Sequence, residues 1–232
     1  MKVSELFYSV QGEGKLVGVP SVFVRASGCN LRCSWCDTPY ASWDPQGEDL
    51  PVGAIVDKVR ALAGDACRHV VFTGGEPAIM PDAEPLCAAL KSLGYHITLE
   101  TAATVYKPLA IDLASLSPKL SNSTPHHREG GKFAAAHDRQ RINVDTIQKF
   151  IDTTPEFQLK FVVSTPQDVT EIDVLLPQLR NVKNTDVQVM PEGTDTPTLS
   201  QRSLWLADLC KQTGWRLSPR LHVLIWGNKR GT

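Results

Sequence analysis

Three cysteines stand close together in the segment SGCNLRCSWCDT, where Cys29, Cys33 and Cys36 follow C-x3-C-x2-C spacing. Four thiolates close an iron–sulfur cluster, whereas this segment offers three and has no fourth cysteine nearby. A [4Fe-4S] cluster held by three thiolates keeps one iron open to a ligand that is not protein. An open coordination position distinguishes a reactive metal site from a structural one. The spacing therefore indicates a reactive cluster.

Other uses of cysteine fit the chain less well. Six cysteines in 232 residues are too sparse for a disulfide scaffold. A structural zinc site usually shows two separated ligand pairs, and no second pair is present. Cys67, Cys87 and Cys210 stand alone among apolar or helix-forming neighbours, so we expect them in the core. On spacing alone, zinc or ordinary thiols remain the alternatives for the triplet.

A second group of polar residues follows predicted strands. Thr73-Gly74-Gly75-Glu76-Pro77 comes directly after the strand-like run HVVFT. Ligands bind at the carboxyl ends of parallel strands, and glycines let a backbone approach a ligand closely. Glu76 is then placed to accept a hydrogen bond from a cationic amine. The alternative is a simple turn between a strand and a helix.

Two later strand ends carry similar polar groups. Ser117-Pro118-Lys119 follows one predicted strand, and we place Gln188 at the end of another. Each is either a ligand contact or a solvated loop end. Trp35, between the last two cysteines, either packs around the metal site or offers its ring to a flat ligand.

The elements that position these residues alternate along the chain. We expect strands at Val22–Arg25, His69–Thr73, Tyr95–Glu100, Leu113–Ser117, Phe157–Ser164, Val187–Met190 and Trp215–Leu217. Helices are expected at Val52–Ala63, Pro81–Leu93, Val169–Leu179 and Ser200–Thr213. Strands that alternate with helices predict an α/β fold with a parallel sheet, and the length predicts a single domain over residues 1–232.

One stretch interrupts this pattern. Leu120–Arg141 is rich in His, Arg, Ser and Gly and has little apolar content, so we expect a loop insertion at about 120–141. It is a surface loop, a mobile lid or a disordered excursion. His126, His127 and His137 have no carboxylate or cysteine at ligand spacing, which argues against a metal site there.

Composition limits the partners. Apolar residues make up 42% of the chain and charged residues 21%, as expected of a soluble globular protein with an apolar core. The net charge is −1. We therefore expect neither nucleic acid nor a membrane as partner. The segment MKVSELFYSVQGEG has no long apolar run, so we expect no signal peptide and a cytoplasmic location.

The cysteine spacing and the GGEP segment together resemble the radical S-adenosylmethionine (SAM) superfamily. That resemblance implies that the open iron binds SAM, and that an electron from the cluster cleaves SAM to a 5′-deoxyadenosyl radical. It also implies a reductant such as flavodoxin or ferredoxin. The residues that it assigns to the cofactor are Trp35, Cys36, Asp37, Gly74, Gly75, Glu76, Ser117, Pro118, Lys119 and Gln188.

The flanking segments narrow the resemblance. Phe7–Gly14, Val24-Arg25, Cys36–Thr38 and Leu221–Gly231 together resemble the 7-carboxy-7-deazaguanine synthases over nearly the whole chain. The family implies a shortened, modified (β/α) TIM-like barrel and a homodimer. It also implies a lyase that converts 6-carboxy-5,6,7,8-tetrahydropterin to 7-carboxy-7-deazaguanine with loss of ammonia, on the route to queuosine and other deazapurines.

The same resemblance implies the substrate contacts. Arg25 offers a planar fork that matches a carboxylate, and Glu100 can accept N–H bonds from the pterin edge. The full implied set is Val10, Gln11, Gly12, Glu13, Arg25, Thr73 and Glu100. Thr38 is implied to bind Mg²⁺ through its hydroxyl, with a loop-capping role as the alternative. Unlike some members, the chain continues past His222 to Thr232.

Two other functions are compatible with the same sequence features. A glycyl-radical-activating enzyme shares the cluster and the small size but acts on a protein. A zinc-binding or redox interaction module would use the cysteines without SAM. Turnover of the pterin and analysis of iron and sulfide distinguish them.

Overall fold

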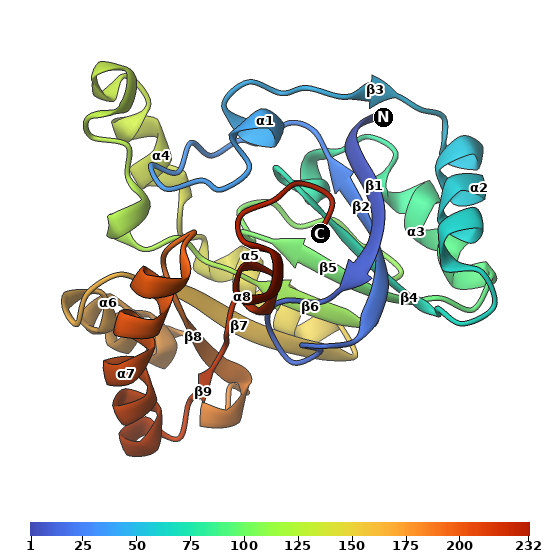
Figure 1. The fold of residues 1–232 in the computed structure, drawn as a ribbon. Helices are drawn as coiled ribbons and strands as arrows, with labels where there is room; N and C mark the ends of the chain where they lie inside the picture. Colours follow the sequence, from blue (N-terminus) through green and yellow to red (C-terminus); the bar gives the residue numbers. More distant parts are fainter.

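The computed structural model describes all of residues 1–232 and shows one curved sheet of nine strands in the order β3-β1-β2-β4-β5-β6-β7-β8-β9 (Figure 1). The strands are β1 (Lys2–Val10), β2 (Pro20–Ala26), β3 (Glu48–Asp49), β4 (His69–Gly74), β5 (His96–Thr101), β6 (Leu113–Leu116), β7 (Glu156–Val163), β8 (Val187–Pro191) and β9 (Arg216–Leu217). From β2 to β9 every pairing in the sheet is parallel, whereas β1 pairs with β2 and with β3 in antiparallel fashion.

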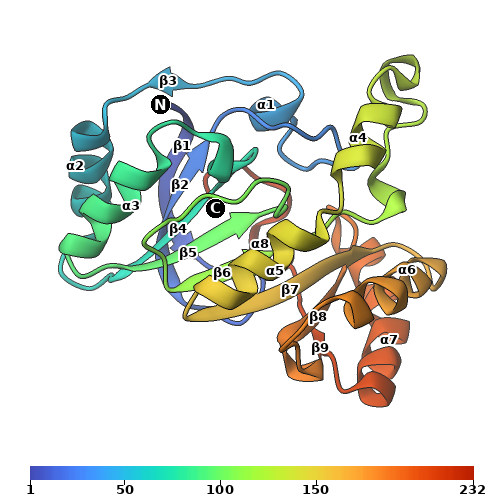
Figure 2. The same cartoon turned by 180° about the vertical axis from the view of Figure 1, so that it is seen from behind.

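Helices follow most of the parallel strands. They are α1 (Pro39–Ser42), α2 (Val52–Ala63), α3 (Ala83–Ser92), α4 (Ala134–Gln140), α5 (Val144–Thr153), α6 (Gln167–Leu175), α7 (Thr196–Thr213) and α8 (Leu221–Trp226). Helices α2, α3, α5, α6 and α7 cover the outer face of the sheet, and α8 lies across the other side (Figures 1 and 2). This arrangement confirms the predicted α/β fold and its partial, modified barrel.

Burial on both faces explains why the central strands are almost wholly apolar. Val22 and Val24 in β2 have no exposed surface, and every residue of β8 is buried. Helix α2 buries Ile55, Val59 and Ala63, spaced four residues apart on one face, against β1 and β2. Regular apolar spacing of this kind is why the predicted bounds of this helix match the structure.

The barrel is not closed by strand pairing. The chain that leaves β1 crosses the open side, where the Gly14 amide donates to Ser218 Oγ at 2.9 Å and the Lys15 amide donates to Gln158 Oε1 at 2.7 Å. These bonds bring residues 11–14 over the end of the barrel. Side chains from both edges of the sheet therefore meet in one place.

Several elements differ from expectation. Strand β1, helix α5 and helix α8 were not predicted, and β1 is antiparallel where only parallel pairing was expected. The 120–141 segment contains two short 3₁₀ turns (Ser121–Ser123 and Arg128–Gly131) followed by α4. No helix combines the length and apolar character needed to cross a membrane.

Candidate active site

A cavity of about 450 Å³ opens where the carboxyl ends of the parallel strands meet. It is lined by most of the residues that the sequence singled out. These are Val10, Gln11, Gly12, Glu13, Arg25, Cys29, Cys33, Trp35, Cys36, Asp37, Thr38, Thr73, Gly74, Gly75, Glu100, Ser117 and Lys119. Glu76, Pro118 and Gln188 do not line it.

The three cysteines stand on an irregular segment, residues 27–38, that we call the cluster loop. Its backbone is braced locally: the Leu31 amide donates to Cys29 Sγ at 3.4 Å, and Trp43 Nε1 donates to the Cys33 carbonyl at 3.0 Å. Cys36 Sγ lies 3.1 Å from Ser42 Oγ. No three His, Cys, Asp or Glu side chains lie close enough to hold a single metal ion.

The donors fit an iron–sulfur cluster. Burial raises the pKa of the Cys29 and Cys33 thiols to about 12, so both are neutral without metal. Metal coordination deprotonates a thiol, and a cluster bound by these three thiolates would keep one iron free for SAM. Lys119 Nζ lies 5.8 Å from the centre of the Trp35 ring on the adjacent wall.

Gly74 and Gly75 have a packing role in addition to the predicted approach to a ligand, which stays a prediction. A Cβ at Gly74 would lie 2.1 Å from the Ala26 carbonyl oxygen, and one at Gly75 would lie 2.1 Å from that of Gly28. Gly74 also has a φ of 140°, which glycine adopts freely. The pair therefore lets the end of β4 pack against β2 and the cluster loop, while both residues also line the cavity.

Glu76 is fully buried behind the cavity wall. Its carboxylate accepts bonds from Thr101 Oγ1 at 2.7 Å, the Ala102 amide at 2.9 Å and the Ala78 amide at 3.0 Å. Burial raises its pKa. The carboxylate thus ties the end of β4 to the end of β5, and its expected contact with the SAM amine stays a prediction.

The placement of Gln188 at a strand end was wrong. Gln188 is the second residue of β8, away from the carboxyl ends, and its side chain donates to Gln158 Oε1 at 2.8 Å. Gln158 in turn donates to Ser115 Oγ at 2.7 Å. The amide therefore belongs to a buried polar network within the sheet. The predicted strand, Val187–Met190, begins where β8 begins, so Gln188 lies near the start of the strand and not at its end.

The opposite wall of the cavity carries a buried cation that the sequence analysis missed. Lys160 on β7 is 3% exposed, and its Nζ donates to Glu13 Oε2 at 2.7 Å and to Glu100 Oε2 at 2.8 Å. The carboxylates raise the pKa of Lys160 despite its burial, and Lys160 together with Arg220 holds the pKa of Glu13 far below its usual range. Glu13 and Lys160 are therefore both charged at neutral pH.

Arg220 extends this network. Its Nε donates to Glu13 Oε1 at 3.1 Å, its Nη1 to the Gly193 carbonyl at 2.5 Å, and its Nη2 to Asp37. Asp37 directly follows Cys36, so this chain of ion pairs joins the cluster loop to the wall that carries Lys160. His222 also lines the cavity, and burial lowers its pKa.

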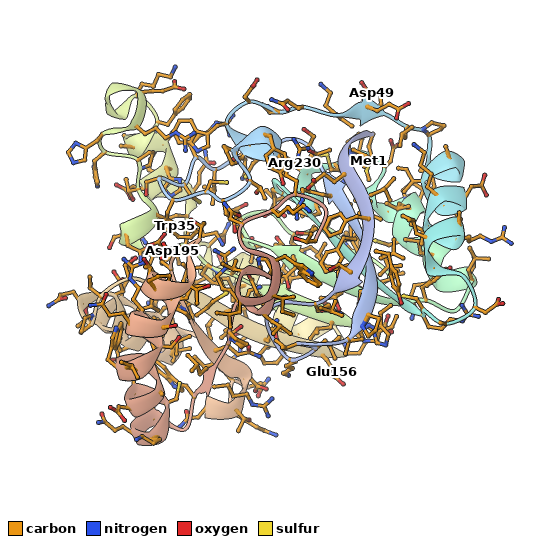
Figure 3. All side chains as sticks on the ribbon, viewed as in Figure 1. Met1, Trp35, Asp49, Glu156, Asp195 and Arg230 are labelled. Atoms are coloured by element: carbon orange, nitrogen blue, oxygen red, sulfur yellow. The ribbon has the colours of Figure 1, made fainter.

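Arg25 is oriented by a residue outside the predicted set. Glu5 on β1 accepts from Arg25 Nε at 2.7 Å, Tyr40 Oη at 2.9 Å and Arg230 Nε at 3.0 Å. Arg230 lies on the C-terminal segment that folds back over the sheet (Figure 3). Glu5 accepts the hydrogen bond from Arg25 Nε, and the two terminal nitrogens of Arg25 have no acceptor within the protein.

Thr38 lies at the start of α1 and lines the cavity. Its side chain makes no capping bond to that helix, and its Oγ1 lies 3.8 Å from Cys36 Sγ. The loop-capping alternative therefore has no oxygen or nitrogen partner in the structure. Binding of Mg²⁺ by this hydroxyl stays a prediction.

The curved parallel sheet and the three-cysteine cavity define a radical SAM enzyme, and the family model of the Radical SAM superfamily matches residues 23–124. The chain belongs to the 7-carboxy-7-deazaguanine synthase family. It is 46% identical to the 7-carboxy-7-deazaguanine synthase of Halobacterium salinarum, over 98% of this chain and 91% of that protein. It is 41% identical to that of Rhodopirellula baltica, over 99% and 88% respectively.

A solved structure agrees with this assignment. The crystal structure of QueE from Escherichia coli matches 95% of this chain and 94% of that chain, with a TM-score of 0.69 and 26% sequence identity. The chain is therefore a radical SAM lyase of deazapurine biosynthesis, and its family uses a [4Fe-4S] cluster and SAM.

Proposed function

We propose that this enzyme converts 6-carboxy-5,6,7,8-tetrahydropterin to 7-carboxy-7-deazaguanine with loss of ammonia. One observation carries the proposal: a single cavity is lined by three cysteine thiols, by the guanidinium of Arg25 with its two unpaired terminal nitrogens, and by the carboxylates of Glu13 and Glu100. The substrate has a carboxylate at one end and N–H donors at the pterin edge. The two walls of the cavity match these two ends in charge.

Cys29, Cys33 and Cys36 would hold the cluster, and Trp35, Asp37, Ser117 and Lys119, which line the same cavity, would contact SAM. When bound, the two cofactors supply a radical that removes hydrogen from C6 of the substrate. The protein's part is to hold C6 in one position and to keep water away from it. Burial of Cys33 and of Lys160 fits that requirement.

Arg25 would receive the substrate carboxylate through its two terminal nitrogens, in a bidentate pair. Glu5 fixes the plane of that guanidinium, since it already occupies Nε. Glu100 uses one oxygen on Lys160. Its other oxygen can accept from the pterin edge, beside Glu13, Thr73 and the Val10–Gly12 backbone.

A magnesium ion is the third proposed cofactor. The Thr38 hydroxyl lacks a helix-capping partner and faces the same cavity as Arg25. Magnesium binds oxygen ligands and keeps several waters, so one hydroxyl, waters and the substrate carboxylate are a sufficient set. The ion would orient the carboxylate beside Arg25.

We also propose a cytoplasmic homodimer that takes electrons from a flavodoxin or ferredoxin. A reducing compartment preserves cluster thiolates that oxygen would attack. The net charge of −1 gives the chain no general attraction to nucleic acid.

Anaerobic incubation with reductant, SAM and 6-carboxytetrahydropterin tests the function, with the product identified by its mass. We expect 7-carboxy-7-deazaguanine and free ammonia from the wild type, and neither from Cys33→Ala. A reconstituted enzyme that cleaves SAM but leaves the pterin intact would contradict the proposal. A glycyl radical formed instead on an added protein would favour the activating-enzyme alternative.

A further inference from the structure

The 120–141 segment has no part in the proposed reaction, yet it packs against the cluster loop in both views of the fold (Figures 1 and 2). Its two ends are tied together: the Lys119 amide donates to the Arg141 carbonyl at 3.1 Å, and Arg141 Nη1 donates to the Lys119 carbonyl at 3.0 Å. The segment is thus a closed excursion from the sheet, and residues in its first part and in its second half contact residues 32–35.

His137 is the central contact. It is 2% exposed, and its Nδ1 accepts the backbone N–H of Arg32, the residue before Cys33, at 3.2 Å. Its Nε2 lies 2.8 Å from Ser123 Oγ, which itself donates to the Leu120 carbonyl at 2.6 Å. Ser123 must then accept from His137, so the imidazole is neutral, with its proton on Nε2.

Two further bonds fix the next residues of the cluster loop. The Ser34 amide donates to the Ser123 carbonyl at 2.8 Å, and Trp35 Nε1 donates to Asn122 Oδ1 at 3.2 Å. The Asn122 amide nitrogen donates to the Val162 carbonyl of β7 at 3.1 Å and to Asp168 Oδ2 at 2.9 Å. The loop is thereby connected to the rigid sheet through the segment.

Aromatic packing covers the same face. The Arg32 guanidinium lies 5.5 Å from the centre of the Phe133 ring, and Trp43 meets Phe133 edge to face at 5.6 Å. Trp43 is also the donor to the Cys33 carbonyl. The cluster loop has no regular secondary structure of its own, so these contacts supply the support that a helix or strand would give.

We propose that His137 is a positioning residue for the iron–sulfur cluster. By accepting the Arg32 N–H, His137 fixes the backbone between Cys29 and Cys33, and the 120–141 segment as a whole holds the cluster loop in place. The inference rests on the proposed three-cysteine cluster site. A cluster with only three protein bonds depends strongly on how well those three thiolates are held. Neither His126 nor His127 takes part, since both are exposed.

The test compares His137→Ala, His137→Asn and His137→Gln with the matched controls His126→Ala and His127→Ala. Each protein is reconstituted anaerobically, and cluster absorbance is followed after addition of an iron chelator. The reduced cluster is then examined by electron paramagnetic resonance. Asparagine can place an oxygen near the Nδ1 position and keep the bond from Arg32, whereas glutamine reaches toward Ser123 instead.

We expect the Ala and Gln variants to lose the cluster roughly tenfold faster than the wild type, because the Arg32 N–H is left without its acceptor. Their reduced-cluster spectra should broaden or shift. The Asn variant and both controls should stay close to the wild type. Failure of the wild type itself to assemble a cluster would instead contradict the proposed function.

Wild-type cluster lifetimes and spectra in all three His137 variants would overturn the inference. Rescue by Gln and not by Asn would also overturn it, because the contact with Ser123 inside the segment would then be the one that matters. Circular dichroism of the apo proteins checks folding. If His137→Ala does not fold, the Asn and Gln pair carries the comparison; if none of the three folds, His137 supports the whole domain and the proposal is wrong.

Discussion

Lys160 Nζ and Glu13 Oε2 lie 2.7 Å apart although 147 residues separate them in the sequence. The bond joins the middle of β7 to the chain that crosses the open side of the barrel. Because Lys160 also holds Glu100, one buried ammonium orients both carboxylates that are available to the pterin edge.

We predict that Lys160→Met lowers stability by about 3–5 kcal/mol and raises the KM for the pterin, since it removes the buried cation that pairs with the partly buried carboxylates of Glu13 and Glu100. Chemical denaturation and steady-state kinetics measure the two effects. Lys91→Met is the control: Lys91 pairs with Asp112 at the surface and should cost no more than about 1 kcal/mol. Equal losses in the two variants would show that the buried pairing at Lys160 has no special importance.

Arg25→Lys should raise the KM for the pterin by roughly tenfold or more, because an ammonium cannot form a bidentate pair with a carboxylate. Uncoupled SAM cleavage should persist, since the cluster side of the cavity is unchanged. Arg202→Lys, on an ion pair with Glu192 outside the cavity, is the matched control. Normal kinetics in Arg25→Lys would place the substrate carboxylate elsewhere.

Alanine at Cys29, Cys33 or Cys36 should abolish cluster assembly and SAM cleavage, because each would remove one of three protein thiolates. Alanine at Cys67, Cys87 or Cys210 should leave iron and sulfide content intact. Cys67 and Cys87 are core residues, with 2% and 0% exposure, so their loss affects packing and not the metal site. Cluster loss in any of these three would overturn the ligand assignment.

If the Thr38 hydroxyl binds Mg²⁺, the turnover rate should depend on the magnesium concentration. Turnover should rise when Mg²⁺ is added to metal-free buffer, and Thr38→Ala should weaken that response while sparing cluster content and SAM binding. Thr38→Ser keeps the oxygen and should retain much of the response. If added Mg²⁺ does not change wild-type turnover, the hydroxyl does not bind the ion and the magnesium proposal is wrong.

Local patterns predicted the elements that are regular and apolar. Helix α2 has its predicted bounds, and β4, β5, β6 and β7 begin and end within one residue of expectation. Helix α5 was missed although Asn143 caps it by accepting from the Thr146 amide, a signal that the sequence NVDTIQKFIDT carries. Strand β1 was not predicted because its sequence, KVSELFYSV, lacks a regular alternation of apolar and polar residues.

The cation side of the active site could not be read from the sequence for a different reason. Arg220 binds Glu13 and Asp37, which lie 207 and 183 residues away, so its role depends on how the sheet curves. Lys160 did carry a local signal: a single lysine within the apolar strand FQLKFVV, where a charge is costly unless it is paired. The cysteine triplet was predictable because its ligands are close in sequence.

The most direct measurement uses 6-carboxytetrahydropterin deuterated at C6, with SAM recovered after anaerobic turnover and analysed by mass spectrometry. The family resemblance implies that hydrogen passes from C6 to the deoxyadenosyl group, that one hydrogen is then returned, and that SAM is regenerated. Deuterium should therefore accumulate in SAM while 7-carboxy-7-deazaguanine forms, and Cys33→Ala should give neither. Product formation with no deuterium in SAM would contradict the account.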